Sequence, residues 1–140
     1  MKRFVCMAGL LVLLAAGVLA TRSSGADDKK NPTIKDIMKK AHNTSNGLLK
    51  NITEELKADD TQWDEVRKDV KELVALVSYL GKNDPPKGDK SSWDQQTKAY
   101  LANAKALEAA AQKQDRKTSL ASQKRLSDSC SSCHSKHRPR

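Results

Sequence analysis

Hydrophobic side chains recur at intervals of three and four residues through most of the chain beyond residue 30, which is the spacing of one face of an α-helix. The first such stretch begins at Asn31 and Pro32, which suit a helix cap and a first helical position, and it continues to about Lys57. Its apolar face consists of Ile34, Ile37, Met38, Ala41, Leu48, Leu49, Ile52 and Leu56. The pattern predicts one continuous helix over residues 31–57.

A second stretch with helical periodicity is predicted to begin near Asp60 or Thr61 and to end at Gly81. Its apolar face consists of Trp63, Val66, Val70, Leu73, Val77 and Leu80. The polar segment KNDPPKGDK follows, and its paired prolines predict a loop.

Two more helices complete the prediction. The third starts with Ser91 or Ser92 as its cap, and its apolar stripe consists of Trp93, Tyr100, Ala104, Leu107 and Ala111. The fourth begins at about Lys117 and has a thin apolar face, formed by Leu120, Leu126, Cys130 and Cys133. No strand pattern is present in the sequence. Four helices with short connections predict an all-α fold, an antiparallel four-helix bundle.

The first 26 residues have a different pattern, in which Lys2 and Arg3 precede an apolar run and small residues follow at 24–26. This pattern predicts a cleaved signal peptide over residues 1–26 and a domain over 27–140; a cut after Ala20 is the second option. An uncleaved membrane anchor is the other interpretation, but the apolar run is short for a bilayer span of about 20 residues. We therefore expect a periplasmic or secreted protein without membrane contact after cleavage.

The composition suggests that the helices enclose something besides their own side chains. The single Phe lies in the predicted signal peptide, so the domain has four aromatic residues, Trp63, Tyr79, Trp93 and Tyr100. Such a core is poor for a domain of this size. A large, flat, apolar cofactor between the helices would supply the missing buried area and would couple folding to its binding.

The chain has 26 Lys and Arg against 17 Asp and Glu, a formal net charge of +9. The basic residues are scattered among acidic ones along the predicted helices, and no basic strip with interspersed aromatic residues is suited to single-stranded nucleic acid. We expect no nucleic-acid partner. A positive surface is compatible with acidic protein partners.

The last predicted helix contains Cys130-Ser-Ser-Cys133-His134, the C-x-x-C-H attachment signature of c-type haem. Two thiols three residues apart on a helix can each add to a vinyl group on the same haem edge. The adjacent imidazole can then ligate the iron. The motif predicts one covalently bound haem c, with Cys130 and Cys133 as anchors and His134 as the proximal ligand.

Two other interpretations of these residues compete with haem. Cys130, Cys133, His134 and His137 are the right types for zinc, but structural zinc sites usually take ligand pairs from two separated segments. A thioredoxin-like redox pair needs a βαβ context, with the cysteines at a helix N-terminus. His137 is predicted to be a rim residue rather than a ligand.

A signal peptide, four helices and a late C-x-x-C-H motif with a basic residue four positions after its histidine resemble the class II cytochromes c, the cytochrome c′ family. The matching residues are Cys130, Cys133, His134 and Arg138. The resemblance implies a haem within the bundle, attached on the C-terminal helix, with Arg138 close to its proximal face. Related bundles often dimerise through their first two helices, so a homodimer is a further expectation.

In that family a residue of the first helix faces the distal side of the haem. A bulky hydrocarbon there leaves a five-coordinate iron that binds small gases, whereas Met gives a six-coordinate iron suited to electron transfer. Met38 resembles this position, and His42 is an alternative distal ligand because it lies four residues later on the same face.

The sequence therefore predicts an exported cytochrome that carries single electrons between redox partner proteins and is not an enzyme. The alternative is a five-coordinate haem protein that binds NO or CO, and a zinc-stabilised bundle with an interaction role ranks behind it.

Overall fold

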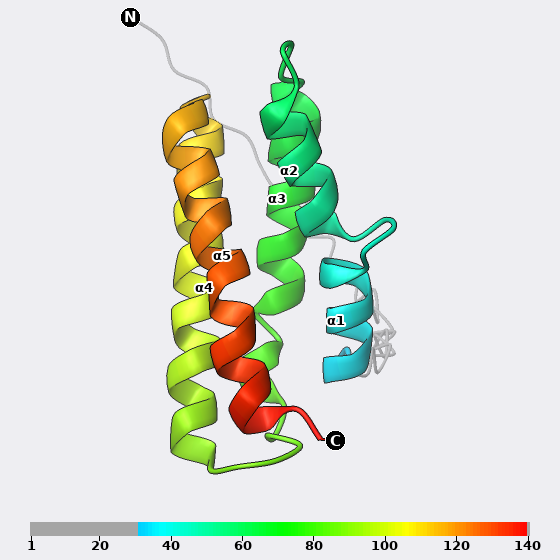
Figure 1. The fold of residues 1–140 in the computed structure, drawn as a ribbon, viewed down its shortest axis with the longest axis vertical. Helices are drawn as coiled ribbons and strands as arrows, with labels where there is room; N and C mark the ends of the chain where they lie inside the picture. Colours follow the sequence, from blue (N-terminus) through cyan, green and yellow to red (C-terminus); the bar gives the residue numbers. More distant parts are fainter. Residues whose placement is uncertain (1–30, 140) are drawn as a thin grey trace, which may run out of the picture.

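The computed structural model describes residues 31–139, and this part of the chain is all-helical (Figure 1). The helices are α1 (Ile34–His42), α2 (Leu48–Lys57), α3 (Trp63–Val77), the short 3-10 helix η1 (Leu80–Lys82), α4 (Lys90–Gln112) and α5 (Arg116–His137). No strand occurs between residues 31 and 139, so the predicted all-α class is confirmed. The predicted signal peptide lies outside the described residues. None of the described helices combines the length and hydrophobicity that a bilayer crossing requires.

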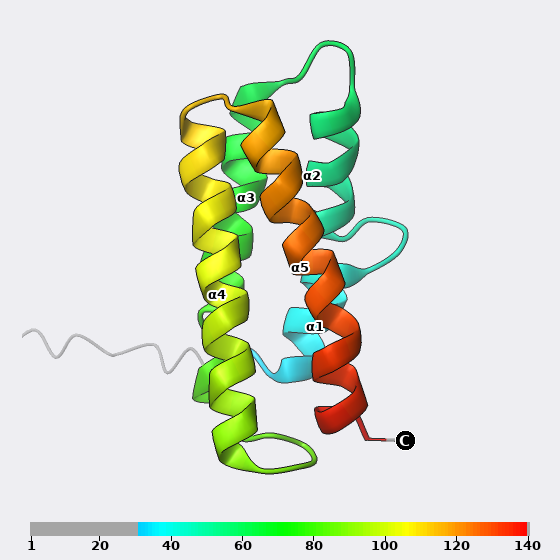
Figure 2. The ribbon, with the colours of Figure 1, turned by 60° about the vertical axis from the view of Figure 1, so that its left-hand side comes forward.

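The long helices α4 and α5 pair along their length, and α3 also packs against α4 (Figures 1 and 2). Helix α2 contacts both α3 and α5. Helix α1 lies at the end of the molecule where α5 finishes, and it packs against α3. This arrangement brings α1, the start of α4 and the last turns of α5 to the same end of the fold.

The prediction of one helix over residues 31–57 is wrong, because a turn at residues 43–47 separates α1 from α2. The side-chain oxygen of Asn43 accepts a hydrogen bond from the backbone N–H of Ser45 at 2.7 Å, and the ψ angle of Asn43 is 132°. A Cβ on Gly47 would lie 2.5 Å from the backbone nitrogen of Asn43, so the turn requires glycine there. Asn and Ser side chains compete with helical hydrogen bonds in this way, and that signal was present in the sequence NTSNG.

The helix starts also differ from the predicted ones, since oxygen-bearing side chains elsewhere supply the caps. Thr33, rather than Asn31, caps α1 in a reciprocal capping box with Asp36. Asp89, rather than Ser91 or Ser92, caps α4 by accepting the Ser92 N–H at 2.7 Å.

The other predicted boundaries move by a few residues. Helix α3 begins at Trp63 and ends at Val77, and Gly81 lies within η1. Helix α5 begins at Arg116, one residue before the predicted start, and Asp115 caps it. Boundary shifts of this size leave the apolar faces in the same register.

The core runs along the helices and matches the predicted apolar faces. Its fully buried large apolar side chains come from all five α-helices: Ile37, Ile52, Leu56, Val66, Val70, Leu73, Val77, Leu107 and Leu126. Helices α4 and α5, which pack against each other, also contribute small buried residues: Ala104, Ala111, Ser119 and Ser122. Small side chains let neighbouring backbones approach closely.

Candidate functional site

A pocket with a cavity volume of about 110 Å³ lies between α1, α4 and the last turns of α5, and it is partly open to solvent. Its lining is mostly apolar and includes Met38, His42, Leu80, Trp93, Tyr100, Cys130, Cys133 and His134. The structure thus brings both cysteines, the adjacent histidine and both candidate distal ligands to one cavity.

A second, more open pocket of about 320 Å³ continues the first one toward the C-terminal end of α5. The two pockets share Met38, His42, Trp93, Cys133 and His134. Arg138 lines this outer part and is exposed. Lys87 and Arg138 also line a hollow beside His134, so the outer edge of the site is positively charged.

Cys130 and Cys133 are half-buried free thiols near the C-terminal end of α5. Burial raises the pKa of both thiols, and the neighbouring Cys130 raises that of Cys133 further. The Cys130 thiol lies 3.6 Å from the Leu126 carbonyl, to which it can donate. A thioredoxin-like pair instead needs a lowered thiol pKa at a helix N-terminus. The environment of these thiols does not fit that interpretation.

The two candidate ligands on α1 differ in their surroundings. Met38 is half-buried and packs against the core. His42 is also half-buried, and its Nε2 lies 2.9 Å from the Tyr100 hydroxyl, with the two rings edge to face at 5.7 Å between centroids. Burial, with a smaller effect of His134, lowers the pKa of His42, so its imidazole is neutral at pH 7.

Tyr100 was not among the predicted site residues, although it shares the α4 stripe that begins with Trp93. Burial raises the pKa of the Tyr100 phenol, and Cys130 and Cys133 raise it further. The phenol therefore keeps its proton over the physiological pH range. Sequence reasoning missed its role because the contact with His42 joins residues 58 positions apart.

The prediction that His137 is a rim residue is wrong, because its side chain is only 2% exposed. Its Nδ1 donates to the Lys87 carbonyl at 2.8 Å, and its Nε2 lies 3.2 Å from the Ser92 hydroxyl. The Trp93 ring meets it edge to face at 5.3 Å between centroids. Both ring nitrogens are thus engaged by the loop before α4 and by the first turn of α4.

A zinc site at the C-terminus of α5 finds no support in this geometry. Over residues 31–139, no three or more His, Cys, Asp or Glu side chains are grouped closely enough to hold a metal ion. A haem iron takes only one or two protein ligands, so the same observation leaves a haem site open.

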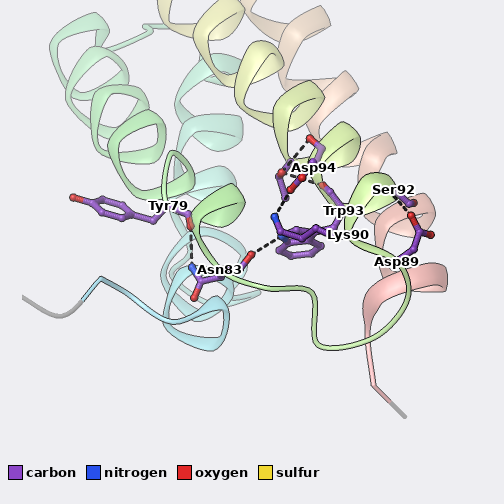
Figure 3. A network of polar contacts seen from close by, with 8 residues as sticks. Tyr79, Asn83, Asp89, Lys90, Ser92, Trp93 and Asp94 are labelled. Carbon is purple, nitrogen blue, oxygen red and sulfur yellow. Dashed lines mark hydrogen bonds and ion pairs between the residues drawn. The ribbon is translucent and has the colours of Figure 1, made fainter.

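Hydrogen bonds connect the loop between η1 and α4 to the neighbouring helices (Figure 3). The Trp93 indole N–H donates to the Asn83 carbonyl at 2.8 Å. The Asn83 side-chain amide donates to the Tyr79 carbonyl at 2.8 Å and to the Pro32 carbonyl at 3.3 Å. These bonds connect the start of α1, the end of η1 and the start of α4, and together with His137 they fix the relative positions of the pocket walls.

Comparison with known proteins adds no relative. No family model, no curated protein and no solved structure matches this chain.

Proposed function

We propose that the protein is an exported c-type cytochrome that carries single electrons, in which α1 and α2 together replace the first helix of an antiparallel four-helix bundle. The observation that supports this most directly is the convergence of Cys130, Cys133 and His134 with Met38 on one mostly apolar pocket. No other part of the described chain combines two cysteines that could anchor a cofactor with side chains that could ligate its metal.

The donor set fits haem c. Cys130 and Cys133 would hold it through thioether bonds, and His134, whose side chain is exposed at the pocket, would be the proximal ligand. When bound, haem supplies a reversible one-electron couple of its iron. Met38 is the preferred distal ligand and His42 the alternative, because both line the same cavity from α1.

The surroundings suit an electron carrier. The buried polar groups of the pocket are already satisfied within the chain, since the Trp93 indole bonds Asn83 and the Thr97 hydroxyl donates to the Trp93 carbonyl at 3.0 Å. A mostly apolar lining disfavours the additional positive charge of an oxidised iron. The polarity of the surroundings is one of the ways in which proteins set a redox potential. Lys87 and Arg138 leave the outer edge positive, which would attract acidic redox partners.

The test is the visible absorption spectrum of the mature protein, produced in a host that can attach haem c, first oxidised and then reduced with dithionite. Sharp α and β bands on reduction are expected for a six-coordinate low-spin iron. Broad high-spin bands that sharpen under carbon monoxide would favour the gas-binding alternative.

The control separates covalent attachment from nonspecific haem uptake. A Cys130→Ala, Cys133→Ala variant should lose its colour after acid–acetone extraction, whereas Ser131→Ala, an exposed change inside the same motif, should keep it. A colourless wild-type protein would refute the proposal.

A further inference from the structure

The contact between His42 of α1 and Tyr100 of α4 places two polar side chains against each other inside a mostly apolar pocket. The Tyr100 hydroxyl and His42 Nε2 are 2.9 Å apart, a normal hydrogen-bond length. Within the described chain, no other protein partner lies within hydrogen-bond reach of the Tyr100 hydroxyl. The ring contact at 5.7 Å restricts how either side chain can turn.

The direction of this hydrogen bond follows from what each arrangement would leave unpaired. If Nε2 carried the proton, the phenol would accept and its own O–H would face an apolar pocket without an acceptor, which is costly. If the phenol donates, its proton is satisfied and Nε2 offers its lone pair. The second arrangement places the imidazole proton on Nδ1 of the His42 side chain, which is only half-buried.

A donating phenol occupies the lone pair through which His42 could bind a metal. A neutral imidazole has one free lone pair, and in this tautomer it is the one on Nε2. In this tautomer His42 can become a ligand only by giving up the bond to Tyr100. The Met38 thioether carries no such constraint, lines both pockets and has a flexible side chain.

We propose that Tyr100 is a positioning residue that withholds His42 from the iron and so leaves Met38 as the distal ligand. This inference rests on the proposed haem function. Met38 and His42 lie one helix turn apart on α1 and line the same cavity, and the inference assigns the sixth coordination position of the iron to Met38. Tyr100 thereby sets the redox potential through ligand choice, since a thioether favours the reduced iron more than a second histidine does.

The test compares Tyr100→Phe with the wild type, because this variant removes one oxygen and keeps the ring. The oxidised wild type should show the weak long-wavelength charge-transfer band of a Met–iron bond. In Tyr100→Phe the band should disappear while the iron stays low-spin, and the midpoint potential should fall. The double variant Tyr100→Phe, His42→Leu should recover the band.

Two further measurements make the test specific. Tyr79→Phe is the matched control, because Tyr79 does not line the pocket, and it should leave both spectrum and potential unchanged. In the diamagnetic reduced wild type, ¹⁵N NMR should show His42 with an unprotonated, metal-free Nε2.

The outcomes separate this inference from the function on which it rests. A coloured protein whose Tyr100→Phe variant keeps the wild-type band and potential would overturn the inference and leave the cytochrome proposal standing. A wild type in which His42 Nε2 is protonated or bound to iron would do the same. A high-spin wild-type iron would overturn the inference and would also favour the gas-binding alternative over the electron carrier. A colourless protein would overturn the function and the inference together.

Discussion

Replacing His137 by alanine should destabilise the protein strongly, because this side chain fastens the end of α5 to the loop before α4. The variant loses the hydrogen bonds to the Lys87 carbonyl and to Ser92, each worth about 1 kcal/mol. It also loses the edge-to-face contact with Trp93, worth about another 1 kcal/mol. We expect the free energy of unfolding to fall by about 3 kcal/mol.

The assay is urea unfolding followed by far-UV circular dichroism, with thermal unfolding as a second measure. A loss of about 3 kcal/mol corresponds to roughly 10 °C in Tm for a domain of this size. Lys136→Ala is the matched control, because that side chain is exposed and adjacent in sequence. A His137→Ala protein as stable as Lys136→Ala, to within about 0.5 kcal/mol, would refute the view that His137 fixes the base of the pocket.

Three further predictions follow from the fold. The Ser122 hydroxyl is buried without a hydrogen-bond partner in the described chain, so Ser122→Ala should raise the free energy of unfolding by about 1 kcal/mol in urea titrations. Gly47→Ala should lower it by about 2 kcal/mol, since the new Cβ would meet the Asn43 nitrogen, whereas Gly81→Ala meets only a side chain at 3.2 Å and should cost less. Burial lowers the pKa of His42 below 6.5, so the unfolded chain binds the proton more tightly than the folded protein does. The free energy of unfolding should therefore fall as the pH drops below about 6.5. The variant His42→Leu should flatten that part of the pH–stability curve.

The sequence was sufficient for the features that depend on neighbours a few positions away. Spacings of three and four located the apolar faces of α3, α4 and α5, and C-x-x-C-H is a local motif. The break between α1 and α2 was missed because the apolar pattern resumes in register at Leu48, which hid the turn chemistry of Asn43 and Gly47.

Contacts between distant segments could not be predicted in this way. His137 has a partner 50 positions away, and the contact of Tyr100 with His42 spans 58. Nothing in the local sequence distinguishes a histidine that is buried against a loop from one at a rim. Whether a side chain is exposed at a pocket or buried beneath it depends on how the helices pack.

The shortness of α1 has a consequence for how the site could be loaded. A nine-residue helix is marginally stable by itself, and a turn separates it from α2. It is held by the Thr33 capping box, the buried side chains Ile37 and Ala41, the hydrogen bond between His42 and Tyr100, and an ion pair between Lys40 and Glu72. Local opening should therefore cost less at α1 than at the longer α3, α4 or α5. Such opening would move α1, with Met38 and His42, away from the pocket. A bulky planar group could then reach Cys130 and Cys133 while the rest of the fold stays assembled.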